Sequence, residues 1–154
     1  MVKSTKLKPG EPAPAFSAFD QDGNIVTLDQ FRGKKLVLYF YPKDNTPGCT
    51  AEACDLRDNY DRFLSEGYEI LGVSADNEKS HQRFISKFDL PFNLISDVDK
   101  KVLNLYNAWG EKKLYGKTFL GVARKTFIIS EEGIIEKIIE KVQTKVHSSQ
   151  IFED

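Results

Sequence analysis

Hydrophobic and polar positions change their period along the chain, and each change predicts a different element. Leu36–Tyr41 is an apolar run without alternation, which is typical of a strand buried on both faces of a helix-covered parallel sheet. The next segment, from Pro47 or Thr50 to about Glu66, repeats apolar residues at spacings of three and four and ends before Gly67. That spacing predicts a helix, and a strand followed by a helix begins a βαβ unit.

Antiparallel pairs are expected near both ends of the chain. Short apolar runs at Phe16–Phe19 and Ile25–Leu28 flank an Asp-Gly turn and predict an N-terminal hairpin. Arg124–Ser130 and Ile134–Glu140 flank a short turn that requires a second antiparallel pair. The elements expected in the remaining chain are strands over 68–74 and 94–96, helices over 78–88 and 99–106, and at most a short helix over 145–154.

This order of elements predicts the fold class. Parallel βαβ units, a later antiparallel pair and a terminal helix indicate an α/β, thioredoxin-like fold with a central mixed β-sheet flanked by helices and an N-terminal β-hairpin. The chain has 154 residues, and neither a repeat nor a linker divides it. We therefore expect residues 1–154 to form a single domain.

Composition narrows the classes of partner and compartment. Lys and Arg number 22 against 23 Asp and Glu, so a net charge of −1 predicts no binding to nucleic acid or anionic lipid. The longest apolar run, Leu36–Tyr41, is too short to span a membrane, and Met1–Lys6 leads into polar residues where a signal peptide has an apolar core. We expect a cytoplasmic protein, whose two cysteines are too few for a secreted disulfide scaffold.

The two cysteines carry the candidate chemistry. Cys49 follows the expected central strand, at the sheet edge where α/β proteins bind ligands. With Thr46 as N-cap and Pro47 as the first helical residue, Cys49 falls in the first turn, whose free N–H groups and dipole stabilise a thiolate. We therefore predict that Cys49 is exposed and nucleophilic. The alternative is a buried cysteine that acts as a small hydrophobe.

Cys54 follows Cys49 by five positions, and this spacing has a structural consequence. On an ideal helix the two Cα atoms are roughly 8.7 Å apart, beyond the roughly 7 Å that a disulfide allows. If Cys49 is oxidised to a sulfenic acid and Cys54 resolves it, the first turns of the helix must unwind. The spacing disfavours a Cys-x-x-Cys exchanger, and a zinc site would need both cysteines to converge with His81 and His147.

Other candidate motifs carry less information. Gly110–Thr118 resembles a phosphate-binding loop but has five residues between its glycines where four are required, so we interpret it as an exposed basic loop. His81 lies on an expected helix and is interpreted as a solvated residue. His147 is interpreted as a residue that helps to start the terminal helix.

The segment around Cys49 resembles the active-site signature of a known family. Pro42-x-x-x-Thr46-x-x-Cys49 is similar to the motif of the peroxiredoxins, thiol peroxidases with a thioredoxin fold. Tyr39–Asp58 as a whole resembles the bacterioferritin comigratory, or Q-type, branch of that family. Similar blocks occur over most of the chain, at 20–23, 71–74, 109–112 and 121–127, although the chain ends slightly earlier than the family's final helix.

The resemblance implies roles for five residues. Cys49 would be the peroxidatic cysteine and Cys54 the resolving one, joined in an intramolecular disulfide that thioredoxin or a similar dithiol reduces. Arg124 would stabilise the thiolate and the charge on the departing oxygen, although it also fits a surface arginine at a strand end. Thr46 would hydrogen-bond the sulfur or the peroxide and Pro42 would shield the pocket from water, although both also fit cap and turn positions.

The expected reaction is the reduction of hydrogen peroxide or an alkyl hydroperoxide. It needs no metal, haem, flavin or other cofactor, and we expect the protein to be a monomer. A second hypothesis is a redox-switched holdase chaperone or peroxide sensor, in which oxidation exposes the apolar face beneath the opened helix. Catalytic consumption of peroxide distinguishes the two.

Overall fold

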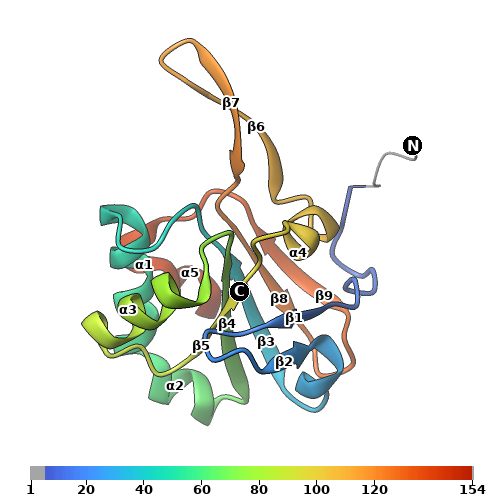
Figure 1. The fold of residues 1–154 in the computed structure, drawn as a ribbon. Helices are drawn as coiled ribbons and strands as arrows, with labels where there is room; N and C mark the ends of the chain where they lie inside the picture. The colour runs from blue at the N-terminus through green and yellow to red at the C-terminus, as the bar shows by residue number, and fades with distance from the viewer. Residues whose placement is uncertain (1–5, 154) are drawn as a thin grey trace.

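A mixed sheet of five strands forms the centre of the computed structural model, which describes residues 6–153 (Figure 1). The strands are β3 (Lys35–Phe40), β4 (Tyr68–Ser74), β5 (Asn93–Ser96), β8 (Lys125–Ile129) and β9 (Ile135–Ile139). Their order is β5-β4-β3-β8-β9. β3, β4 and β5 run parallel, β8 pairs antiparallel with β3, and β9 pairs antiparallel with β8. The predicted central mixed sheet is therefore confirmed, with β3 in the middle.

β3 is buried on both faces because its side chains alternate between two hydrophobic clusters. Leu36, Leu38 and Phe40 belong to one cluster. Val37 and Tyr39 belong to the other. All five side chains are at most 1% exposed, which explains why this segment of the sequence is apolar without alternation.

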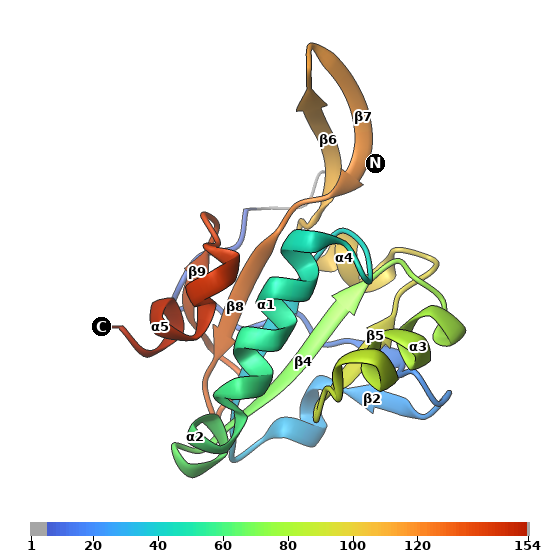
Figure 2. The same ribbon diagram turned by 90° about the vertical axis from the view of Figure 1, so that its left-hand side faces the viewer.

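Helices cover the two faces of the sheet unequally (Figure 2). The face of Val37 and Tyr39 packs against α1 (Pro47–Asp58), α2 (Tyr60–Ser65), α3 (Glu78–Phe88) and α5 (His147–Phe152). The opposite face packs against α4 (Lys101–Leu105) and the predicted N-terminal hairpin of β1 (Ser17–Phe19) and β2 (Ile25–Thr27). Short 3₁₀ turns occur at Leu28–Phe31 and Thr144–Val146. None of the helices in the described chain is both long enough and apolar enough to cross a membrane.

Two segments differ from the prediction. The single helix expected up to Glu66 is broken at Asn59, whose side-chain amide donates a hydrogen bond to the backbone carbonyl of Asp55, a competition with helical bonding that is typical of asparagine. The expected exposed basic loop at Gly110–Thr118 is wrong. That segment belongs to a β-hairpin of β6 (Trp109–Leu114) and β7 (Lys117–Val122) that projects from the body of the molecule (Figure 1).

Candidate active site

Cys49 lies in the first turn of α1, beyond the carboxyl end of the central strand. Thr46 occupies the N-cap position and Pro47 is the first helical residue, both as predicted. The Thr46 side chain makes no capping bond, because its hydroxyl donates to the carbonyl oxygen of Lys43 at 2.8 Å. The positive end of the helix dipole is therefore directed at the segment that carries the cysteine.

The sulfur of Cys49 is buried beside a cation. The side chain is only 1% exposed, so the predicted exposure is wrong. Arg124 Nη2 donates a hydrogen bond to Cys49 Sγ at 3.1 Å, which sets this cysteine apart from a small hydrophobe. Gly48 lies beside the same nitrogen, which a Cβ atom at this position would meet at 3.4 Å, an ordinary van der Waals contact. The guanidinium therefore places a positive charge beside the buried sulfur.

Arg124 follows β7 and bridges two acidic groups. Its Nη1 donates to Oε1 of Glu52 at 2.7 Å while its Nη2 donates to the sulfur of Cys49. Burial alone would lower the pKa of this guanidinium, but the negative charges of Cys49 and Glu52 raise it. Because the planar guanidinium offers parallel donors, one side chain can orient both partners.

Glu52 is a site residue that the sequence analysis missed. Its side chain is fully buried, and burial raises its pKa from 4.5 to about 7, although Arg124 opposes this shift. Oε2 of Glu52 has no hydrogen-bond partner among the described residues and lies 3.5 Å from Nε2 of His147. A signal was available, because a residue three positions after Cys49 on a helix lies on the same side as the cysteine.

His147 begins α5, as interpreted from the sequence, but it is also fully buried. Its Nε2 lies 2.7 Å from the hydroxyl oxygen of Thr126, and its Nδ1 lies 2.9 Å from Oε1 of Gln150. Burial lowers the pKa of the imidazole. The C-terminal helix therefore contributes a neutral histidine to the surroundings of Glu52.

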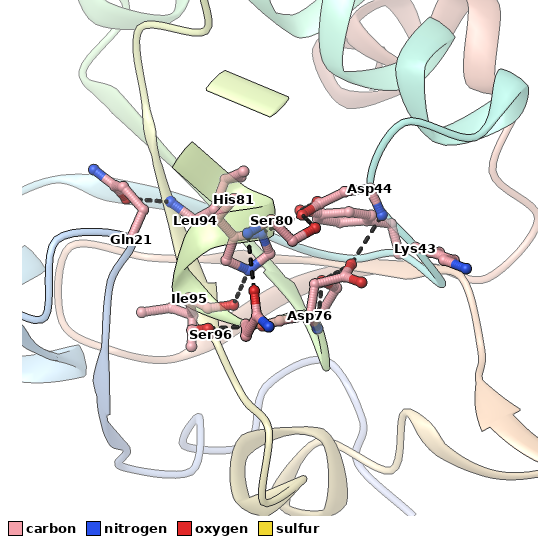
Figure 3. A network of polar contacts seen from close by, with 12 residues as sticks. Gln21, Lys43, Asp44, Asp76, Ser80, His81, Leu94, Ile95 and Ser96 are labelled. Atoms are coloured by element: carbon pink, nitrogen blue, oxygen red, sulfur yellow. Dashed lines mark hydrogen bonds and ion pairs between the residues drawn. The ribbon is translucent and has the colours of Figure 1, made fainter. Parts of the chain in front are cut away.

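A second polar network anchors the loop between β3 and α1 (Figure 3). Asp44, in that loop, accepts hydrogen bonds from the hydroxyls of Tyr41 and Ser80 and lies 2.7 Å from Nδ1 of His81. Nε2 of His81 lies 2.8 Å from the carbonyl oxygen of Ile95. Both ring nitrogens therefore lie within hydrogen-bond distance of oxygen atoms. His81 is fully buried, so its interpretation as a solvated residue is wrong.

The same network contains a group of residues with the spacing of a cation site. Ligand atoms of Asp44, Asp76 and His81 lie within 4.8 Å of one another. Oδ2 of Asp76 accepts the Asp44 N–H at 2.8 Å and a serine hydroxyl at 2.7 Å. These donors use the lone pairs that a cation would need, so we assign the cluster to the loop anchor. The zinc set considered from the sequence is not assembled within residues 6–153, because each histidine contacts a different carboxylate.

The remaining residues singled out from the sequence lie near Cys49 in the chain. Cys54 lies farther along α1, is half-buried, and both cysteines are free thiols. The helix is continuous from Pro47 to Asp58, so the structure presents the two cysteines in an unopened helix. Pro42 is half-buried in the loop before α1.

Comparison with known proteins agrees with this geometry. Residues 9–138 match the AhpC/TSA family. Peroxiredoxin Bcp of Escherichia coli (strain K12) is 45% identical over 146 residues, which cover 95% of this chain and 94% of that protein. Peroxiredoxin Q of Xanthomonas campestris has a TM-score of 0.83 at 39% identity, over 88% of this chain and 86% of that one.

A PrxQ mutant of Xylella fastidiosa has a TM-score of 0.89 at 29% identity, over 96% of this chain and 94% of that one. These neighbours share the thioredoxin fold, which confirms the predicted fold class. The matched length, the level of identity and the buried cysteine beside an arginine lead to one conclusion. The chain belongs to the AhpC/TSA family and is a peroxiredoxin of the Bcp, or Q, type, a thiol peroxidase.

Proposed function

We propose that Cys49 is the peroxidatic cysteine of this peroxidase and that its substrates are hydrogen peroxide and alkyl hydroperoxides. The observation that carries the assignment is the 3.1 Å hydrogen bond from Arg124 to the buried sulfur. A solved structure of the Xanthomonas campestris bacterioferritin comigratory protein is described by its alkyl peroxide reduction activity. We extend that substrate class to this chain.

In the first step, the Cys49 thiolate attacks the distal oxygen of the peroxide. The O–O bond breaks, the sulfur becomes a sulfenic acid, and the other oxygen leaves with a negative charge that Arg124 stabilises. The Thr46 hydroxyl donates its hydrogen to Lys43, so its lone pairs are available to accept the O–H of the peroxide. Pro42, half-buried in the same loop, limits the access of water.

In the second step, the sulfur of Cys54 attacks the sulfenic acid of Cys49. A disulfide forms, and water leaves with the proton of the Cys54 thiol. Because α1 is continuous over both residues, its first turns must unwind before the sulfurs meet. Thioredoxin or a similar dithiol then reduces the disulfide and allows the helix to form again.

The proposal extends to the organisation of the protein. Residues 1–154 act as a single domain and as a monomer in the cytoplasm. The chemistry uses two sulfurs and a dithiol, so it requires no metal or organic cofactor. Peroxide and the dithiol protein are the two partners in the cycle.

Peroxide consumption coupled to thioredoxin, its reductase and NADPH tests the assignment of the two cysteines. Cys49→Ser should abolish consumption. Cys54→Ser should consume about one equivalent and stop as a sulfenic acid. Equal multiple-turnover activity in both variants would contradict the roles. The holdase or sensor hypothesis predicts oxidation without turnover, so the same assay separates it from the peroxidase.

A further inference from the structure

Glu52 and His147 form a fully buried pair, and Glu52 accepts a hydrogen bond from Nη1 of Arg124. Nδ1 of His147 lies 2.9 Å from Oε1 of Gln150. That oxygen also accepts the backbone N–H of Gln143, while the amide nitrogen of Gln150 donates to a backbone carbonyl. Oε1 is therefore an acceptor, and Nδ1 of His147 must carry a proton.

The opposite ring nitrogen, Nε2, has a lone pair when His147 is neutral. The hydroxyl oxygen of Thr126 lies 2.7 Å from Nε2 and can accept a hydrogen bond when Nε2 carries a proton. Oε2 of Glu52 lies 3.5 Å from Nε2 and has no hydrogen-bond partner among the described residues. Without a proton between them, the lone pairs of Oε2 and Nε2 face each other in a buried space. One shared proton makes the contact favourable.

The surrounding charges agree with one proton on this pair. Burial raises the pKa of Glu52 to about 7, and burial lowers the pKa of His147. Near neutral pH the pair therefore binds one proton more readily than two. The titratable and charged groups that face the pair from the packed elements are Cys49 and Asp55 of α1, Arg124 after β7, Lys137 of β9 and the buried hydroxyl of Tyr39 in β3.

We propose that Glu52 and His147 hold one shared proton while Cys49 is a thiolate and release it when the sulfur is oxidised. The inference rests on the proposed peroxidatic role of Cys49. Both residues are positioning residues that act on the sulfur through Arg124, and the proton that they release passes to solvent, where it offsets the proton that the leaving oxygen takes up. The C-terminal helix α5 thereby becomes part of the reaction site.

Release of this proton keeps the charge of the buried site balanced during the reaction. The sulfur gives an electron pair to the distal oxygen and becomes a neutral sulfenic acid, and the other oxygen leaves as hydroxide or alkoxide, which needs one proton. Before the step, the thiolate balances Arg124 and the protonated pair is neutral. After the step, the Glu52 carboxylate balances Arg124 in place of the thiolate. The buried site stays neutral throughout, which avoids an uncompensated buried charge.

A proton count during one turnover tests the proposal. In a Cys54→Ser protein, which stops at the sulfenic acid, a pH indicator in weak buffer follows proton uptake after one equivalent of hydrogen peroxide. The measurement is made about one unit below the Glu52 pKa of about 7, where the pair is loaded. This parent protein should take up almost no proton from solvent, because the pair supplies it.

The decisive variant is Glu52→Gln in the same Cys54→Ser protein. The glutamine amide still accepts from Arg124 and gives Nε2 of His147 a permanent donor, but it cannot release a proton, so about one proton per protein must come from solvent. Glu69→Gln is the matched control, because Glu69 accepts a hydrogen bond from Tyr60 at 2.8 Å in another part of the molecule. This control should behave as the parent does.

Equal proton uptake in the parent and in Glu52→Gln overturns the proposal, whether both take up one proton or none. Trapping of the sulfenic acid with dimedone in the same samples tests the proposed function separately. If Cys49 forms no sulfenic acid, the peroxidatic role fails and the proton proposal fails with it. If Glu52→Gln does not fold, infrared difference spectra of the Cys54→Ser protein decide. The carbonyl band of a protonated carboxylic acid must disappear on oxidation, and its persistence overturns the proposal.

Discussion

His81 and His147 are both fully buried beside a carboxyl group, but the two carboxyl groups differ in the number of hydrogen bonds that they accept. The Asp44 carboxylate lies 2.7 Å from His81, and hydroxyl groups donate to both of its oxygens. Glu52 lies 3.5 Å from His147, and its Oε2 has no hydrogen-bond partner in the described part of the chain. Asp44 belongs to the loop before Cys49, and Glu52 belongs to the helix that carries it.

The difference separates a structural anchor from a group that can change its charge. A carboxyl group whose two oxygens both accept hydrogen bonds, as in Asp44, holds its loop in place. A buried carboxyl with an unbonded oxygen binds a proton readily, and for Glu52 burial moves the pKa to about 7. The loop network therefore holds the cysteine in place, whereas the Glu52 pair adjusts the charge around it.

Removal of His81 from its hydrogen-bonded pair with Asp44 should have the largest effect on stability. His81→Ala leaves Asp44 buried without its partner, which costs about 3–5 kcal/mol of unfolding free energy. Urea denaturation measures the loss. Glu66→Ala is the control, because it breaks an exposed pair with Arg62 and should cost less than about 1 kcal/mol. A loss in His81→Ala as small as that of the control would remove the distinction between the two pairs.

Replacement of the guanidinium should have the next largest effect, on the reaction rate. Arg124→Lys keeps the charge, but a single ammonium cannot reproduce the parallel donors to Cys49 and Glu52. The rate constant of the reaction with hydrogen peroxide should fall by about 10²–10³, as measured by competition with a haem peroxidase. Arg62→Lys, at an exposed position, should leave the rate unchanged. An undiminished rate in Arg124→Lys would show that charge alone suffices.

The pair of Glu52 and His147 should make the free energy of unfolding depend on pH. The folded protein binds the Glu52 proton more tightly than the unfolded chain, because burial raises the pKa from 4.5 to about 7. This stabilisation is fully present below pH 4.5, the pKa of Glu52 in the unfolded chain, and is lost as pH rises through about 7. Over this range Glu52→Gln should gain up to about 3 kcal/mol relative to the unaltered protein.

Urea denaturation of both proteins at several pH values measures this gain. His147, whose pKa is lowered by burial, contributes the opposite trend. Because Glu52 and His147 titrate as a pair, the difference between the two proteins reports the change in the pair as a whole. A difference in unfolding free energy that stays constant from pH 4.5 to about 7 would show that Glu52 does not titrate in this range.

The smallest expected effect concerns the anchored loop itself. Thr46→Val keeps the branched side chain but removes the hydroxyl that bonds Lys43 and that we expect to accept from the peroxide. Loss of one hydrogen bond of about 1 kcal/mol should slow the peroxide reaction roughly fivefold. Thr50→Val makes the same change in the first turn of α1 and is the matched control. If Thr46→Val reacts as fast as the control, the hydroxyl serves only the loop.

Local sequence patterns predicted the elements that depend on neighbouring residues. The apolar run of β3, the Thr46-Pro47 start of α1 and the strand over 68–74 are all recovered. Each of these depends on contacts or caps that a short segment encodes. The β6–β7 hairpin was missed because both of its faces are largely exposed, so its sequence lacks the alternation of a half-buried strand.

Residues of the site that pair across the chain could not be predicted in the same way. Asp44 and His81 lie on a loop and a helix that only the βαβ crossover brings together. Glu52 meets His147 only after the antiparallel strands return the chain to α1. The exposure expected for Cys49 was wrong for a related reason, because the cysteine packs in a cluster with residues distant in the chain, such as Ile128 and Ile139.

Hydrogen exchange across Pro47–Asp58 shows whether Cys49 reacts within α1 and whether the helix then opens to let Cys54 reach it. Mass spectrometry reports exchange in the reduced protein, after one equivalent of peroxide, and after reduction with thioredoxin. We expect a protected helix in the reduced protein, then a protein lighter by two hydrogens in which the first turns of α1 exchange rapidly, and then restored protection. A disulfide between the two cysteines in a helix as protected as the reduced one would contradict this expectation.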